Sequence, residues 1–256
     1  MKKVLSIAIY LLLFTTAINA DFLKIEAGAG AWMQTPNTSM NYKDNLLTGK
    51  DESLGSEETN GYVWIYLKHP IPIIPNIRLE YVGISSKGTA SGNFTFFPKN
   101  LPADTDSNID MTQFDIVPYY NILDNTAWVT LDIGLDIKVI ESTYSASPSV
   151  DVMAGDVSSR YEETSSDILP LLYVRARLEI PSTSIGLETD VKYLTYDTTE
   201  VIEFRAKVDY TLEFVPVVQP AIELGYRVQT MDRVTDEDLV IDYDFAGVYA
   251  GIMLRF

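Results

Sequence analysis

The chain ends with Ile241–Phe256, which reads IDYDFAGVYAGIMLRF and alternates in polarity with a period of two. One face of this stretch carries Ala246, Val248, Ala250, Ile252, Leu254 and Phe256, and the other carries Phe245, Gly247, Tyr249, Gly251, Met253 and Arg255. Successive side chains of a β-strand point to opposite faces, so the stretch predicts a strand with one continuous apolar face.

The same alternation recurs in nine upstream segments, which predicts an all-β fold. The segments are 22–33, 61–68, 77–86, 109–120, 129–140, 168–180, 185–193, 202–212 and 222–229. The clearest is 129–140, where Val129, Leu131 and Ile133 alternate with Thr130, Asp132 and Gly134. Together with the closing segment, the pattern predicts about ten strands, with eight or twelve as alternatives.

The connections between these segments alternate in length over most of the chain. Long polar stretches occupy 34–60, 87–108 and 142–167, whereas 69–76, 121–126, 181–184 and 215–220 are short. Short turns at one end and longer loops at the other are typical of transmembrane barrels. The connections after the seventh and ninth segments are shorter than this pattern requires.

A soluble β-sandwich or lipocalin-like barrel would show the same alternation, because either face could be the buried one. The segments run about 9 to 14 residues, long enough to cross a bilayer at a tilt and longer than usual globular strands. Their polar face carries full charges in nearly every segment, which is unusual for a protein core. The sequence therefore predicts a transmembrane, antiparallel, up-and-down β-barrel.

Residues 1–20 have the organisation of a secretory signal peptide, with Lys2 and Lys3 before an apolar run and a cleavage point expected after Ala20. The expected division is thus a signal peptide over 1–20 and a barrel over 21–256. The chain has no cysteine, which excludes disulfides and thiolate metal sites. Its net charge of −17, or about −19 without the two lysines, argues against nucleic acid as a partner.

The closing strand also resembles the C-terminal strand of bacterial outer-membrane β-barrel proteins, including uncharacterised porin-like families. Their assembly signal runs polar-x-Gly-x-x-hydrophobic-x-aromatic, and Tyr249, Gly251, Leu254 and Phe256 match it. The resemblance implies a location in the bacterial outer membrane and insertion by the outer-membrane assembly machinery. It also implies contact with outer-membrane lipid and lipopolysaccharide.

If the apolar face contacts lipid, the charged face lines the lumen. The candidate lumen charge network consists of Lys24, Glu26, Arg78, Glu80, Asp132, Asp136, Lys138, Arg175, Arg177, Glu188, Lys192, Arg205, Lys207 and Arg227. The same face also carries Lys68, Arg255, Asp115, Glu179, Asp190, Glu203, Asp209, Glu213 and Glu223. This gives eleven basic and twelve acidic residues, so most of the excess acid is expected in the outer loops.

A nearly neutral lumen has two interpretations, because small barrels are filled by side chains and large ones leave a channel. The first hypothesis is a narrow, porin-like channel for small hydrophilic solutes. The alternative is a non-conducting structural or surface-interaction barrel that acts through its long acidic loops. The glycines of the inner face are expected to make room for Trp32 and Tyr249, or to mark close backbone approach.

An enzyme is not expected, because the single histidine, His69, falls in a predicted turn at the periplasmic end. No cofactor motif or metal-ligand spacing occurs, although acidic loops could attract divalent cations. The aromatic stretch Asn93–Pro98, NFTFFP, is an unexplained feature of an otherwise polar loop. The sequence leaves the solute, the partner and the oligomeric state open.

Overall fold

The computed structural model describes residues 23–42, 45–47, 58–71, 73–89, 94–96, 99–101, 105–148, 160–197, 199–212, 218–236 and 239–256. Within these ranges the chain is all-β, and none of the described residues form a helix long and apolar enough to cross a membrane. The expected signal peptide over 1–20 lies outside the described residues, as do most of the acidic loop residues.

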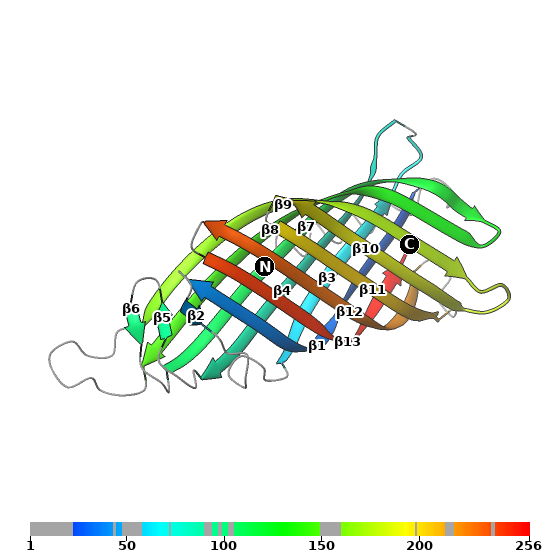
Figure 1. Ribbon diagram of the computed structural model, residues 1–256. Coiled ribbons are helices and arrows are strands. Elements are labelled where there is room, and N and C mark those ends of the chain that lie inside the picture. Colours follow the sequence, from blue (N-terminus) through cyan, green and yellow to red (C-terminus); the bar gives the residue numbers. More distant parts are fainter. Residues whose placement is uncertain are drawn as a thin grey trace, which may run out of the picture.

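Ten long antiparallel strands form one closed barrel (Figure 1). They are β1 (Lys24–Tyr42), β3 (Glu58–Lys68), β4 (Asn76–Thr89), β7 (Thr105–Thr126), β8 (Val129–Pro148), β9 (Tyr161–Glu179), β10 (Ile185–Tyr196), β11 (Thr199–Thr211), β12 (Gln219–Asp236) and β13 (Leu239–Arg255). Three short strands, β2 (Asn45–Leu47), β5 (Phe94–Phe96) and β6 (Lys99–Leu101), lie at one end of it. The prediction of a ten-stranded antiparallel barrel is confirmed.

The sheet closes where β1 pairs with β13, from Glu26↔Arg255 to Tyr42↔Leu239. Phe256 extends this pairing, since its N–H donates to the carbonyl of Ile25 at 2.9 Å. The stagger of the barrel is found by following paired residues from strand to strand once around it. Starting at Glu179 of β9, this path returns to β9 at Asp167, so the stagger is twelve residues. Strand number and stagger together set the tilt and width of a barrel, so this one is only slightly wider than an eight-stranded barrel.

The two ends of the barrel differ. The turns β3–β4, β7–β8, β9–β10 and β11–β12 lie at one end with both termini of the described barrel, as expected for the periplasmic side. Toward the opposite, outer end, the strands are longer than the alternating segments predicted from the sequence. β7, for example, has 22 residues. The short linker expected over 121–126 is wrong, because these residues continue β7 down to a tight turn at Ala127 and Trp128.

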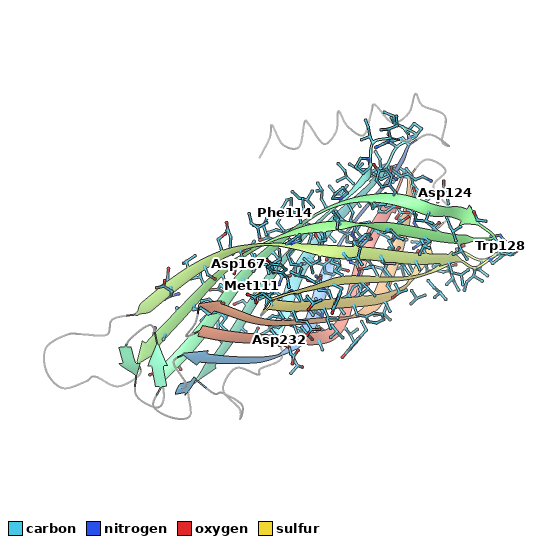
Figure 2. The ribbon with its side chains drawn as sticks, turned by 45° about the horizontal axis from the view of Figure 1, so that its top comes forward. Met111, Phe114, Asp124, Trp128, Asp167 and Asp232 are labelled. Carbon is cyan, nitrogen blue, oxygen red and sulfur yellow. The ribbon has the colours of Figure 1, made fainter. Side chains whose placement is uncertain are left out.

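The outward face of the barrel is an apolar belt. Its exposed side chains include Ile65, Leu135, Leu172, Leu224 and Ile252. Exposed Tyr120 and Tyr210 lie toward the short turns, with Trp128 at the tip of one of them (Figure 2). Phe114, Tyr193 and Tyr226 lie further along their strands. A contiguous apolar outer surface flanked by aromatic residues suits a lipid bilayer, where a closed sheet leaves no backbone edge unpaired.

The inner face changes character along the barrel. Toward the periplasmic end it is charged, whereas beyond Glu80 on β4 the next inward residues are Val82 and Ile84. The buried apolar side chains on the inner face of this outer region include Trp32, Val82, Ile84, Ile109, Met111, Ile140, Leu169, Leu171, Val201, Met231 and Phe245, and we call these eleven the apolar layer. Gln34, Gln113 and Gln229 are buried at the same level. Outward residues at the same level are polar, as in the pair Ser85↔Asp110. Along each of these strands the inward face therefore changes from polar to apolar, and the outward face changes from apolar to polar. The alternation of inward and outward residues itself continues without interruption.

The β7–β8 turn contains unfavourable backbone. Ala127 and Trp128 have φ of 51° and 68°, in the left-handed region that disfavours residues with a Cβ. Glycine would adopt this conformation without that cost. We expect Ala127→Gly to raise the free energy of unfolding by about 1 kcal/mol, measured by urea titration of the refolded protein in vesicles.

The matched control is Ala206→Gly, in the middle of β11, where no special backbone angle occurs. There the change should lower stability by roughly 0.5–1 kcal/mol. Equal effects of the two substitutions would contradict the strained turn.

Candidate functional site

A single cluster of charged side chains fills the periplasmic and middle part of the lumen. Eighteen of them are buried, eight basic and ten acidic, so the interior is close to neutral. They are Arg78, Lys138, Arg175, Arg177, Lys192, Arg205, Lys207 and Arg227, with Glu26, Glu80, Asp115, Asp132, Asp136, Glu188, Asp190, Glu203, Asp209 and Glu223. We call this set the lumen network.

Glu80 joins opposite walls of the barrel. Its carboxylate accepts from Arg78 of the same strand at 2.8 Å and from Arg227 of β12 at 2.7 Å. It also lies 3.3 Å from the guanidinium of Arg205. Arg205 comes from β11, which is five places away from β4 in the ring of ten strands and therefore directly opposite. Side chains from facing walls thus meet on the barrel axis.

A second centre is Glu188 of β10. Its carboxylate lies 2.6 Å from Arg175, 3.2 Å from Arg177 and 3.4 Å from Lys207, and 3.9 Å from Arg78 on the far side of the lumen. Because Arg78 also pairs with Glu80, the two centres belong to one continuous network. Each buried charge has counter-charges within reach, which offsets the cost of removing it from water.

Toward the apolar layer, the network ends in two lysines. Lys138 lies 2.7 Å from Asp115 and 2.8 Å from Glu203. Lys192 pairs with Asp115 and lies 3.0 Å from Asp136. These contacts join β8 and β10 to β7 and β11, so they too cross the lumen.

Aromatic side chains fill the space that the charges leave. Tyr62 donates its hydroxyl to Glu223 of β12 at 2.7 Å, and the indole N–H of Trp64 reaches the same carboxylate at 3.2 Å. Lys207 and Arg78 lie over the Trp64 ring at 4.6 and 5.4 Å from its centroid. Such cation–π contacts stabilise a charge that has lost its hydration.

Two glycines of the inner face leave room for these rings. A Cβ on Gly28 would lie 2.5 Å from the indole nitrogen of Trp64, and a Cβ on Gly251 would lie 2.4 Å from the Tyr62 hydroxyl. Gly28 and Gly251 therefore make room for Trp64 and Tyr62, whereas the expected room for Tyr249 is found at Gly225, whose Cβ would lie 2.5 Å from the Tyr249 ring. The alternative of close backbone approach holds at Gly134 and Gly247, where a Cβ would meet the carbonyl oxygens of Pro118 and Met33.

The structure places thirteen of the fourteen candidate network residues inside the barrel, each in at least one ion pair. Glu26 and Lys138 join the others through residues outside the fourteen, Glu26 through Arg255 and Lys138 through Asp115 and Glu203. Lys24 differs, because it lies at the periplasmic rim with its side chain 44% exposed and contacts only Glu26, at 3.1 Å. Lys68 is also near this rim, paired with Asp124 at 2.5 Å, and Glu213 lies outside the described residues. At the start of a strand a long side chain reaches solvent more easily than the lumen.

The four residues of the expected assembly signal occupy both faces of β13. Tyr249 is buried in the lumen, edge-to-face with Tyr62 at 5.5 Å between ring centroids. Leu254 is 40% exposed on the lipid face, and Gly251 and Phe256 pair with β1. Recognition of this strand by an assembly machinery stays a prediction.

His69 is part of a turn. Its Nδ1 accepts from the backbone N–H of Ile71 at 3.2 Å, and its Nε2 lies 3.1 Å from the carbonyl of Pro75. Both ring nitrogens are therefore engaged in holding the β3–β4 connection. Among the described residues no group of three or more His, Cys, Asp or Glu is placed to hold a metal ion.

The sequence reading did not identify the apolar layer as a unit. Its signal is present, because Val82 and Ile84 follow Arg78 and Glu80 on one face of β4, and Ile109 and Met111 are on the inner face of β7. The prediction from sequence gave each strand face a single polarity along its whole length, and so the change from charged to apolar residues on the inner face was missed. The layer covers the outer end of the lumen network with buried hydrocarbon.

The closed barrel has counterparts among solved structures. The outer membrane protease OmpT of Escherichia coli is 13% identical, with 91% of this chain and 97% of that chain covered and a TM-score of 0.49. Like that protein, this chain is a closed, antiparallel all-β barrel, here of ten strands. Ail, the attachment invasion locus protein of Yersinia pestis, is 8% identical over 92% of this chain and 99% of that chain, with a TM-score of 0.34. A FadL homologue of Pseudomonas aeruginosa is 8% identical over 92% and 90%, with a TM-score of 0.39.

No protein-family model and no curated protein sequence matches the chain. At these identities, the activities of the similar outer-membrane barrels do not carry over to this one. Its function has to be argued from its own lumen and surfaces.

Glu80 gives the most direct test of the lumen network. Glu80→Ala removes the anion shared by Arg78, Arg205 and Arg227 and leaves buried cations with fewer partners. We expect the free energy of unfolding in vesicles to fall by about 3–5 kcal/mol, the usual cost of breaking a buried ion pair from one side.

Asp124→Ala is the matched control, because the Lys68–Asp124 pair is ionic but lies at the exposed rim. Its loss should cost less than about 1 kcal/mol. A similar small effect at Glu80 would contradict a tightly packed network.

Proposed function

We propose that the protein is a non-conducting outer-membrane barrel that acts through its outer end. The observation that carries this proposal is the meeting of Glu80 with Arg205 from the opposite wall. A path for hydrated solutes needs space along the barrel axis, and here ion pairs span it. Side-chain-filled interiors are usual for barrels of about this size.

The apolar layer adds a second barrier. Ions that passed the network would next meet buried Ile84, Leu171 and Phe245, which offer no hydrogen bonds. Transfer of an unpaired ion into such surroundings is very costly. Both barriers favour the surface-interaction hypothesis over the porin-like channel, which stays a prediction until conductance is measured.

The outer end has the features of an interaction surface. β7, β8 and β9 continue past the apolar belt, with polar outward residues and buried inner ones, and β12 and β13 continue past it as well. This arrangement carries the outer ends of these strands above the lipid surface. Rigid scaffolds that present variable loops are a common design for binding.

The proposal includes no catalysis. His69 is the chain's single histidine and belongs to the periplasmic end, where its ring holds a turn. The buried carboxylates of the lumen network are shared among several cations, an arrangement that suits structural ion pairs. A role in cleaving or modifying molecules outside the cell would need reactive groups at the outer end.

Single-channel recording in a planar bilayer tests the proposal. We expect no steady conductance from the refolded protein at any moderate voltage, while heat-modifiable migration in SDS gels verifies that the inserted protein is folded. The matched variant carries Glu80→Ser, Arg205→Ser and Arg227→Ser, which removes the ion pairs that Glu80 makes across the lumen. It should show at least transient openings if the network is the main barrier.

Steady conductance of the unmodified protein that changes with Asp136→Ala or Arg175→Ala would contradict the proposal. Both side chains lie inside the network, so such sensitivity would mean that ions pass through it. The channel hypothesis would then be the correct one.

A further inference from the structure

The barrel wall has a lateral seam between β3 and β4. The two strands pair from Leu67↔Ile77 to Tyr62↔Val82, where their ladder ends. Both strands nevertheless continue outward, β3 to Glu58 and β4 to Thr89. On their other sides they remain paired, β3 with β1 and β4 with β7, so this part of the wall divides along the line between β3 and β4.

A groove of about 690 Å³ follows the seam. Its lining includes the outward-facing Val63, Tyr81 and Thr112 and the inward-facing Tyr62, Ile84 and Met111. The groove therefore touches residues of both faces of the sheet. Its size is in the range of sites for small organic ligands.

Small residues keep the seam open. Gly61 and Gly83 would stand opposite each other if the ladder continued by one pair, and both line the groove. A Cβ on Gly61 would meet no atom within 4 Å, and a Cβ on Gly83 would meet only the Tyr81 hydroxyl, at 3.8 Å. Larger side chains would thus fit at both positions, and they would project into the groove.

Asn60 bridges the two strands where the ladder is interrupted. Its Oδ1 accepts from the backbone N–H of Ser85 at 2.9 Å. Its Nδ2 is buried and has no hydrogen-bond partner among the described residues. Burying an amide N–H without a hydrogen-bond acceptor costs free energy. A ligand that places an acceptor atom in the seam would bind this N–H and remove that cost.

The groove is continuous with the lipid-facing surface. Val63 and Tyr81, 49% and 43% exposed, belong to the apolar belt, and Tyr81 is paired with exposed Phe114 of β7 (Figure 2). Just beyond them the outward residues become polar at Ser85 and Asp110. The seam therefore opens at the upper edge of the belt, where hydrocarbon chains meet the headgroup region of the outer leaflet.

We propose that the β3–β4 seam takes one acyl chain of an outer-leaflet lipid, with the ester carbonyl of the lipid accepting from Asn60 Nδ2. The chain lies along Val63 and Tyr81 and reaches Ile84 and Met111 through the opening. Lipid is the occupant because the groove continues the bilayer surface and combines apolar lining with one buried donor. The proposal is independent of whether the lumen conducts.

Photo-crosslinking in vesicles tests this site. The refolded protein is inserted into vesicles of phosphatidylcholine containing a fraction with a diazirine in the acyl chain, irradiated, digested and mapped by mass spectrometry. We expect labelling of the inward-facing Ile84 and Met111. Ile140 is the internal control, since it is equally buried but lies behind an intact wall between β7 and β9.

Gly83→Leu should fill the groove and reduce labelling of Ile84 and Met111 to the background seen at Ile140. Ala206→Leu is the matched control, because it adds the same side chain to the lipid face of β11 away from the seam, and it should leave labelling unchanged. If Gly83→Leu fails the gel test for folding, Gly61→Leu is used in its place. Labelling confined to outward-facing residues, or unaffected by the leucine placed at Gly83 or Gly61, would overturn the proposal.

Discussion

The pairing of β1 with β13 is the constraint on which the rest of the structure depends. In lipid an open sheet edge would leave a row of backbone groups without partners, so the ten strands have to close. Closure with a stagger of twelve residues sets a narrow interior. At that width, Arg205 from one wall reaches Glu80 on the opposite wall, and charged side chains from eight of the ten strands merge into one lumen network.

That network explains how a membrane barrel can bury eighteen ionisable side chains. Individually each would be too costly to remove from water, and the cost falls only because almost every charge is shared. Glu188, for example, lies within 4 Å of four cations. Shared partners also hold the long arginine side chains in fixed positions, so the interior behaves as a packed core.

Beyond the lipid the strands keep the same alternation of inward and outward residues, but their outward face is surrounded by water. The outward face there meets water and is polar, so the inward face supplies the hydrophobic core that any soluble β-domain needs. Leu171 and Met111 lie on the same strand faces as Arg175 and Asp115. The outer end is thus a small rigid domain continuous with the barrel, and the β3–β4 seam lies at the junction between the two environments.

The sequence was sufficient to predict the strands that cross lipid, because there the outward face is uniformly apolar and the inward face is charged. It also assigned to the lumen most of the charged side chains that the described residues place there, although Lys24 and Lys68 lie at the rim instead. It could not predict that Glu80 meets Arg205, since facing strands are known only once the strand number and stagger are known. The outer extensions were underestimated because, beyond the predicted bounds, outward residues such as Glu141 are polar and inward residues such as Tyr144 are apolar, the reverse of the pattern that marks the predicted strands.

The most direct test of this account is a double-mutant cycle between Glu80 and Arg205, measured as free energies of unfolding in vesicles. If their side chains meet across the lumen, the losses from Glu80→Ala and Arg205→Ala should be non-additive by at least about 1 kcal/mol. Lys24→Ala, at the rim and out of contact with Glu80, should be additive with Glu80→Ala. Additivity of Glu80 with Arg205 to within about 0.5 kcal/mol would contradict a lumen closed by ion pairs from opposite walls.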